Sequence, residues 1–158
     1  MTAAEQRSAA GSRAAIRRSD LVAEALTWRE TPYRDHIAAK GIGTDCVGYL
    51  SAVASKFGIA HRLPAGYPSA PGDRSARRAI EELCGPPIAP AAMRPADVLL
   101  FRIGEHEQHF GLVTALEPEP YFIHAFARQK IDRVVVNRLD RFWRARLVGV
   151  YRIPGLED

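Results

Sequence analysis

The stretch that follows Cys46 has the clearest helical spacing of apolar residues in the chain. The apolar residues four, seven and eleven positions after it are Leu50, Val53 and Phe57. This spacing keeps them on one face of a helix, and Gly58 suits the left-handed residue that follows a helix end. Thr44 or Asp45 can cap the start, because each offers a side-chain oxygen to the free backbone N–H groups of the first turn. The pattern predicts a helix that begins at or near Cys46.

Two further helices are predicted, one on each side of this one. Residues 21–29 carry apolar residues at helical spacing after Asp20, which can cap the helix. Pro32 sets the end of that helix, because a residue before proline avoids the helical conformation. Residues 76–83 repeat the amphipathic pattern after Asp73, which predicts a surface helix.

From residue 96 onward the pattern changes to short apolar runs separated by polar turns. The expected strands are residues 98–102, 109–116, 121–125, 131–136 and 147–153, with a helical turn at 139–143. Helices followed by consecutive short strands are the order of an α+β domain with an antiparallel sheet. No repeat or long linker interrupts this order, so we expect residues 19–158 to form one domain.

Residues 1–18 differ in composition from the rest of the chain. They are rich in Ala, Ser and Arg, and after the initial Met their one large apolar residue is Ile16. Such a segment cannot bury enough apolar surface to offset its ordering entropy, which predicts a flexible N-terminal arm. It lacks the apolar core of a secretory signal. No apolar stretch of the chain has membrane-spanning length, so we expect no membrane insertion.

Charge and composition narrow the classes of partner. The 158 residues carry 22 Lys and Arg against 18 Asp and Glu, a net charge of +4, and a hydrophobic content of 47% excludes global disorder. No basic run is interleaved with aromatic residues, so we do not expect nucleic-acid binding. A mild positive charge suits an anionic polymer such as a bacterial cell wall.

Cys46 is the first candidate for chemistry. The positive end of the helix dipole favours a thiolate there, and a thiolate beside a base is a nucleophile. The alternative is a small buried residue in a core helix, since free cysteines are often buried. Cys84 ends the next helix with no candidate base near it in sequence, so we expect it to be a packing residue. We expect both cysteines to be free thiols.

A cysteine nucleophile needs an imidazole base and a third group that orients the imidazole. The histidines in predicted loops are His36, His61 and His106. His109 opens one predicted strand, and His124 lies near the end of the next. If the two strands pair across the turn at residues 117–120, both side chains can meet on one face of the hairpin. The alternative is a pair of structural histidines.

A metal site is another interpretation of the same region. The segment Glu105-His106-Glu107-x-His109 contains carboxylate and imidazole groups, which are common metal ligands. Alternating residues in a polar turn rarely preform such a site. We therefore expect no metal and no other cofactor.

Five motifs in order resemble the NlpC-type papain-like cell-wall peptidases, and more narrowly the short stand-alone versions encoded in phage and gene-transfer-agent tail modules. The motifs are Thr31-Pro32-Tyr33, Asp45-Cys46-x-Gly48, Pro95-Ala96-Asp97-Val98-Leu99-Leu100-Phe101, His109-x-Gly111-Leu112-Val113 and Ile123-His124-Ala125. The resemblance covers roughly residues 20–153. It implies a papain-like α+β fold in which N-terminal helices pack on a five-stranded antiparallel sheet.

The resemblance also assigns a role to each matching residue. Cys46 matches the nucleophile, His109 the general base, and His124 the polar residue that orients the base. Tyr33 matches a tyrosine that lines the site and helps the backbone N–H of Cys46 hold the oxyanion. Asp45 matches an acidic residue that meets the free amine of a peptidoglycan stem peptide. The family cleaves the bond between D-glutamate and the diamino acid of that peptide.

Two positions depart from the family pattern. Val47 stands where members often have Ser, and Phe110 stands where a small residue is common after the histidine. We expect both changes to affect the substrate cleft more than the catalytic pair, which leaves the cleaved bond open.

The resemblance thus predicts a peptidoglycan endopeptidase that a phage-like tail tip delivers to the wall. Its expected partners are the stem peptide and tail-tip proteins. The expected location is the tail tip of a virion or phage-like particle, made in the cytoplasm and acting in the periplasm or wall. The alternatives are a structural tail-tip component or plug, and a cytoplasmic amidase or acyltransferase on the same fold.

Overall fold

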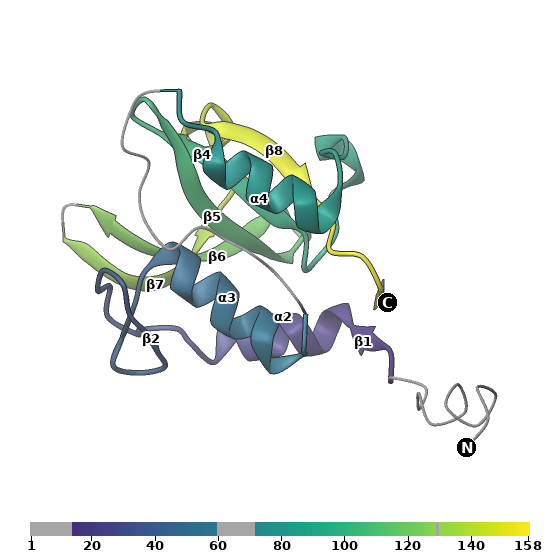
Figure 1. The fold of residues 1–158 in the computed structure, drawn as a ribbon, viewed down its shortest axis with the longest axis horizontal. Helices are drawn as coiled ribbons and strands as arrows, with labels where there is room; N and C mark the ends of the chain where they lie inside the picture. The colour runs from purple at the N-terminus through teal and green to yellow at the C-terminus, as the bar shows by residue number, and fades with distance from the viewer. Residues whose placement is uncertain (1–13, 60–71, 129) are drawn as a thin grey trace, which may run out of the picture.

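The computed structural model describes residues 14–59, 72–128 and 130–158, and it has the predicted α+β architecture (Figure 1). The helices are α2 (Arg18–Leu26), α3 (Cys46–Lys56), α4 (Ser75–Cys84), the 3-10 turn η1 (Pro90–Ala92) and α5 (Arg141–Arg144). The main strands are β4 (Val98–Ile103), β5 (His106–Ala115), β6 (Tyr121–Arg128), β7 (Ile131–Arg138) and β8 (Leu147–Tyr151). The two-residue strands are β1 (Ile16–Arg17), β2 (Ala38–Ala39), β3 (Gly43–Thr44) and β9 (Leu156–Glu157).

The five main strands form one antiparallel sheet in the order β7-β6-β5-β4-β8, which confirms the predicted sheet. Strand β5 begins at His106, three residues before the predicted start. The β4–β5 connection can be this short because Gly104 adopts a positive φ of 62° and reverses the chain at once. β5 is therefore long enough to reach from the core to the candidate site.

Two cores lie on opposite faces of the sheet. Helices α2, α3 and α4 cover one face, as Figure 1 shows. The larger core, on this face, includes Leu21, Val53, Ile80, Val98, Leu112 and Ile123. The smaller core, on the other face, includes Leu99, Phe101, Val113, Phe122, Trp143 and Val150. Alternate residues of each strand supply the two cores, as the two-residue period of a strand requires.

The N-terminal helix differs from the prediction. α2 begins at Arg18 after an extended Arg17, so Asp20 lies inside the first turn and does not cap the helix. The helix ends at Leu26, and turns bridge the gap to Pro32. The last three residues of the predicted arm are part of the folded structure, because β1 pairs with β9 and Arg18 is buried. The rest of the predicted arm, residues 1–13, lies outside the described residues.

A buried charge cluster explains the aspartate of the third motif. Asp97 is fully buried, and its carboxylate accepts hydrogen bonds from Arg18 at 3.3 Å and from Arg152 at 2.9 and 3.1 Å. Arg18 also donates to the carbonyl of Pro95, and it pairs with Asp158 at 3.4 Å. The cluster therefore fastens α2 and the C-terminal end of the chain to the start of β4.

In the part of the chain that the structure describes, the helices are all too short or too polar to cross a membrane.

Candidate active site

Cys46 is the first residue of α3, and the capping of this helix explains the spacing Asp45-Cys46-x-Gly48. One carboxylate oxygen of Asp45 accepts the N–H of Gly48 at 2.6 Å, and the other accepts the N–H of His36 at 2.8 Å. A Cβ on residue 48 would meet the Ile37 carbonyl at 2.8 Å and the Asp45 carboxylate at 2.9 Å. Only glycine fits there, so the motif fixes Cys46 at a helix N-terminus.

The hairpin of β5 and β6 brings the two predicted histidines together. Leu112 pairs with Ile123, so His109 and His124 lie on one face of the hairpin, offset diagonally. The His109 Nε2 and His124 Nδ1 atoms are 2.7 Å apart, which confirms the predicted contact. Both side chains are buried.

A third polar side chain extends the histidine pair into a line of three hydrogen-bonded side chains, Asn137, His124 and His109. The Oδ1 atom of Asn137 on β7 lies 2.7 Å from Nε2 of His124. Because this oxygen can only accept, His124 carries its proton on Nε2 and presents a lone pair at Nδ1. His109 then donates from Nε2, and its Nδ1 is left as an unprotonated acceptor. Asn137 thus selects the tautomer in which His109 can serve as a base.

Gly111 has a packing reason to follow His109 two residues later. A Cβ on residue 111 would lie 2.7 Å from the ring of Phe122. That ring packs against His124, with the ring centroids 4.6 Å apart. The glycine therefore lets an aromatic ring fill the space beneath the histidine pair.

Aromatic rings surround the two histidines. Trp143 stacks on His109 at 5.8 Å, and Phe126 stacks on His124 at 5.1 Å. Asp140 caps the short helix α5 by accepting the N–H of Trp143 at 3.2 Å. This apolar enclosure disfavours a charged imidazole. Burial lowers the pKa of His124 to about 4, and burial together with the neighbouring His124 lowers the pKa of His109 well below its usual value.

A small pocket joins these groups to Cys46. Its volume is about 100 Å³. The residues that line it are Tyr33, Cys46, Ile103, Gln108, His109, Ala125, Phe126 and Ala127. The Cys46 thiol donates to the Gln108 carbonyl at 3.7 Å. Cys46 and His109 therefore line one and the same pocket.

The Cys46 sulfur does not have the low pKa that the helix terminus suggests. Burial raises the pKa of the Cys46 thiol to about 11, and the charge of Asp45 adds to the rise. The backbone N–H groups of Phe110, Val47 and Cys46 itself oppose this shift, but burial outweighs them. The helix N-terminus alone therefore does not lower the pKa of the Cys46 thiol, because burial of the sulfur acts in the opposite direction.

The remaining predicted site residues have mixed outcomes. Tyr33 lines the pocket, so it is placed to contact a substrate. Asp45 does not line it, and both its carboxylate oxygens already accept backbone N–H groups, a position that does not favour a contact with a substrate amine. Phe110 is in the main core and does not line the cleft, contrary to expectation, because it points to the opposite face from His109. Val47 packs partly against the same core.

Two other histidines and the metal hypothesis can also be placed. His36 is exposed in a loop, and His106 is the first residue of β5, where the prediction had a turn. Within residues 14–59, 72–128 and 130–158, no three His, Cys, Asp or Glu side chains are grouped so as to hold a metal ion. Glu107 instead pairs with Arg77 at 2.6 Å.

Sequence reasoning missed Asn137, Gln108, Phe126 and Trp143. Asn137 carries a usable signal, because it is the first polar residue after the apolar run Val134-Val135-Val136. Its link to His124 depends on the β6–β7 register, in which Asn137 pairs with Phe122 and shares the face of His124. Gln108 acts through its backbone carbonyl, which its side-chain type does not reveal.

Comparisons with known proteins identify the fold. No family model and no curated protein matches the sequence. A Staphylococcus aureus protein described as similar to lipoprotein, NLP/P60 family, matches 93% of this chain at 19% identity with a TM-score of 0.63. The NlpC/p60 domain of the peptidoglycan hydrolase SagA matches 87% of this chain at 20% identity with a TM-score of 0.62. NlpC2 from Trichomonas vaginalis matches 86% at 14% identity with a TM-score of 0.63.

This chain corresponds to all of the SagA domain, but to 45% of the Staphylococcus aureus protein and 46% of NlpC2. All three matches are to NlpC/P60 proteins or domains. The chain therefore has the papain-like NlpC/P60 fold.

Proposed function

We propose that this protein is a cysteine peptidase that hydrolyses peptidoglycan stem peptides. The observation that carries the proposal is the line from Asn137 through His124 to His109, which ends at the pocket that Cys46 lines. Both the NlpC/P60 fold and these three hydrogen-bonded side chains fit the family that the sequence motifs resemble. SagA, a structural neighbour, is described as a peptidoglycan hydrolase, which supports the same substrate class.

The first half of the reaction forms a thioester. Nδ1 of His109 takes the proton of the Cys46 thiol as the sulfur attacks the scissile carbonyl carbon. The carbonyl oxygen becomes an oxyanion near the backbone N–H of Cys46, with Tyr33 at the wall of the same pocket. The tetrahedral intermediate collapses when His109 returns the proton to the leaving amine. The C–N bond breaks, and the acyl group stays on the sulfur.

The second half releases the acid product. A water molecule gives a proton to His109 and attacks the thioester carbonyl, and the C–S bond breaks as the sulfur is reprotonated. The two half-reactions as written require no oxidant, metal or cofactor. In both halves of the reaction, Nδ1 of His124 accepts the hydrogen bond from Nε2 of His109, and Asn137 accepts the hydrogen bond from Nε2 of His124.

Digestion of purified peptidoglycan tests the proposal. Wild-type protein should release fragments whose masses correspond to cleavage between D-glutamate and the diamino acid, and Cys46→Ala should release none. Fragments of other masses would support a peptidase that cleaves a different bond. Equal release by both proteins would refute the proposal. Turnover of a small acyl substrate without any action on muropeptides would instead favour an amidase or acyltransferase.

The delivery route is part of the proposal. The narrower motif resemblance is to tail modules, so we expect the protein in the tail tip of a phage-like particle that carries it to the wall. Mass spectrometry of purified particles should detect it. Its presence in the cell lysate and absence from the particles would contradict this route and leave the peptidase proposal intact. Presence in particles without wall digestion would favour a structural plug.

A further inference from the structure

An arginine-lined pocket lies next to the candidate active site, on the same hairpin of β4 and β5. Its volume is about 630 Å³, and Arg77, Arg102 and Arg146 contribute to its wall. The other residues that line it are Gly104, Ala145, Leu147 and Val148. Ile103, which stands between Arg102 and Gly104 in sequence, lines the candidate active site instead. The hairpin thus separates two distinct cavities.

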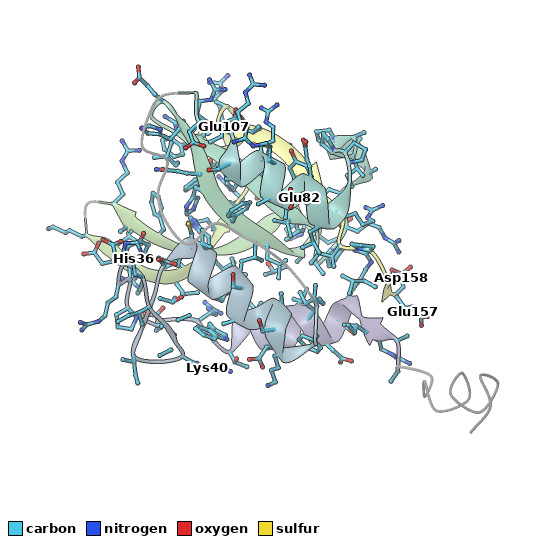
Figure 2. The ribbon with its side chains drawn as sticks, in the orientation of Figure 1. His36, Lys40, Glu82, Glu107, Glu157 and Asp158 are labelled. Carbon is cyan, nitrogen blue, oxygen red and sulfur yellow. The ribbon has the colours of Figure 1, made fainter. Side chains whose placement is uncertain are left out.

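The arginines of this pocket outnumber the acid that balances them. Arg77 binds Glu107 at 2.6 and 2.8 Å, and Glu107 is 5% exposed. Arg102 reaches the same carboxylate only at 3.8 Å. Among the described residues, Glu107 is the one acid with an ion pair to these arginines, which leaves two positive charges uncompensated. Figure 2 labels Glu107 near one end of α4, where nitrogen-tipped side chains gather.

Two of the three guanidinium groups are held in place by the protein. Arg77 is fixed by its ion pair with Glu107. Arg146 lies over the ring of Phe142 at 3.6 Å and donates to the Phe142 carbonyl at 2.8 Å. Arg102 is tied to the same loop because its backbone N–H donates to the Arg146 carbonyl at 2.8 Å. An anion would meet donors that are already positioned, so less ordering entropy opposes binding.

The charge and size of the pocket select a ligand class. Guanidinium groups pair with phosphate through two parallel hydrogen bonds. A phosphate monoester carries about 1.5 to 2 negative charges at neutral pH, which matches the two uncompensated positive charges. The volume lies in the range of small-molecule sites and leaves room beside the phosphate for a sugar-sized group. We propose that this pocket binds a phosphate monoester attached to a sugar-sized group. The proposal does not depend on the proposed peptidase activity.

Calorimetric titration with defined probes tests the pocket. The probes are glucose 6-phosphate, inorganic phosphate and glucose. We expect saturable binding of glucose 6-phosphate, weaker binding of inorganic phosphate and none of glucose. Arg102→Gln and Arg146→Gln should each weaken glucose 6-phosphate binding by about tenfold or more. Thermal melting of each variant shows whether it is folded. If one of the two variants does not fold, the other still tests the pocket.

Arg78→Gln is the matched control, because Arg78 is exposed on α4 and does not line the pocket. It should bind as the wild type does. Equal weakening by Arg78→Gln would show diffuse surface charge and overturn the proposal, as would the absence of saturable binding. Tight binding of a short single-stranded DNA that depends on Arg102 would also overturn it. Cys46→Ala should bind the sugar phosphate normally, which separates this result from any failure of the peptidase.

A sedimentation assay with cell-wall glycan, before and after phosphatase treatment, identifies the source of the ligand. Lower co-sedimentation after treatment would assign the phosphate to the wall. Unchanged co-sedimentation, together with binding of glucose 6-phosphate, would assign the pocket to a free sugar phosphate.

Discussion

Acid should destabilise this protein through its buried histidines, and the size of the effect follows from the structure. Burial lowers the pKa of His124 to about 4, whereas an unfolded chain has a histidine pKa near 6.5. Between these values the unfolded chain binds a proton at His124 and the folded chain does not, so stability falls as pH falls. The slope is about 1.4 kcal/mol per pH unit for one proton, which totals about 3 kcal/mol over the window.

His109 strengthens this dependence in the same direction, because burial also lowers its pKa. The contribution of His124 should be fully present above about pH 6.5 and should be lost as the pH falls toward 4, and His109 adds to the loss in the same direction. Urea unfolding followed by tryptophan fluorescence at intervals from pH 8 to pH 4.5 measures the free energy of unfolding. Trp28 and Trp143 are both buried, so their emission reports on unfolding.

The variant His124→Gln isolates the contribution of one histidine. It keeps a polar side chain at the site but removes the titrating group. As the pH is lowered, its free energy of unfolding should therefore decrease less steeply than that of the wild type. His36→Gln is the comparison variant, because it removes an exposed histidine that is not part of the buried pair. Equal slopes for wild type and His124→Gln would show that His124 is not held neutral. The tautomer argument for His109 would then fail.

Four further substitutions have distinct expected results. Cys46→Ser should keep the far-UV circular dichroism of the wild type and abolish wall digestion, because a hydroxyl is a far weaker nucleophile, whereas Cys84→Ser should keep both. Gly111→Ala should lower stability by about 1–3 kcal/mol in urea unfolding and reduce digestion, because its Cβ would lie 2.7 Å from the Phe122 ring. Asp97→Ala should cost about 3–5 kcal/mol of stability, because it removes the buried carboxylate that pairs with Arg18 and leaves Arg18 only the exposed Asp158, and an unchanged melting temperature would contradict this.

Local sequence signals predicted the elements that depend on local physics. The helix after Cys46 follows from its apolar spacing, and the cap at Asp45 follows from a side-chain oxygen next to free N–H groups. The hairpin that joins His109 to His124 follows from two apolar runs across a short turn. Each of these depends on residues that are close in sequence, so the sequence alone contains the information.

The features that sequence reasoning missed depend on contacts between distant parts of the chain. α2 begins early, directly after β1, and β1 pairs with β9, which is more than a hundred residues away in sequence. Asn137 meets His124 only through the register of β6 and β7. The direction of the Cys46 pKa shift depends on how deeply the packed domain buries the sulfur, and a helix N-terminus by itself suggests the opposite direction.

Burial has two opposite consequences for the proposed chemistry. It keeps His109 unprotonated at neutral pH, so the base is always available, but it also keeps Cys46 in the thiol form. Transfer of the proton between them is therefore unfavourable in the empty pocket, and it becomes favourable only as the sulfur forms its bond to the carbonyl carbon. The hydrogen bonds from His109 through His124 to Asn137 favour this proton transfer, because they keep the proton of His109 on Nε2 and orient its ring. Such a site uses general base catalysis with a neutral pair, and substrate binding supplies the remaining driving force.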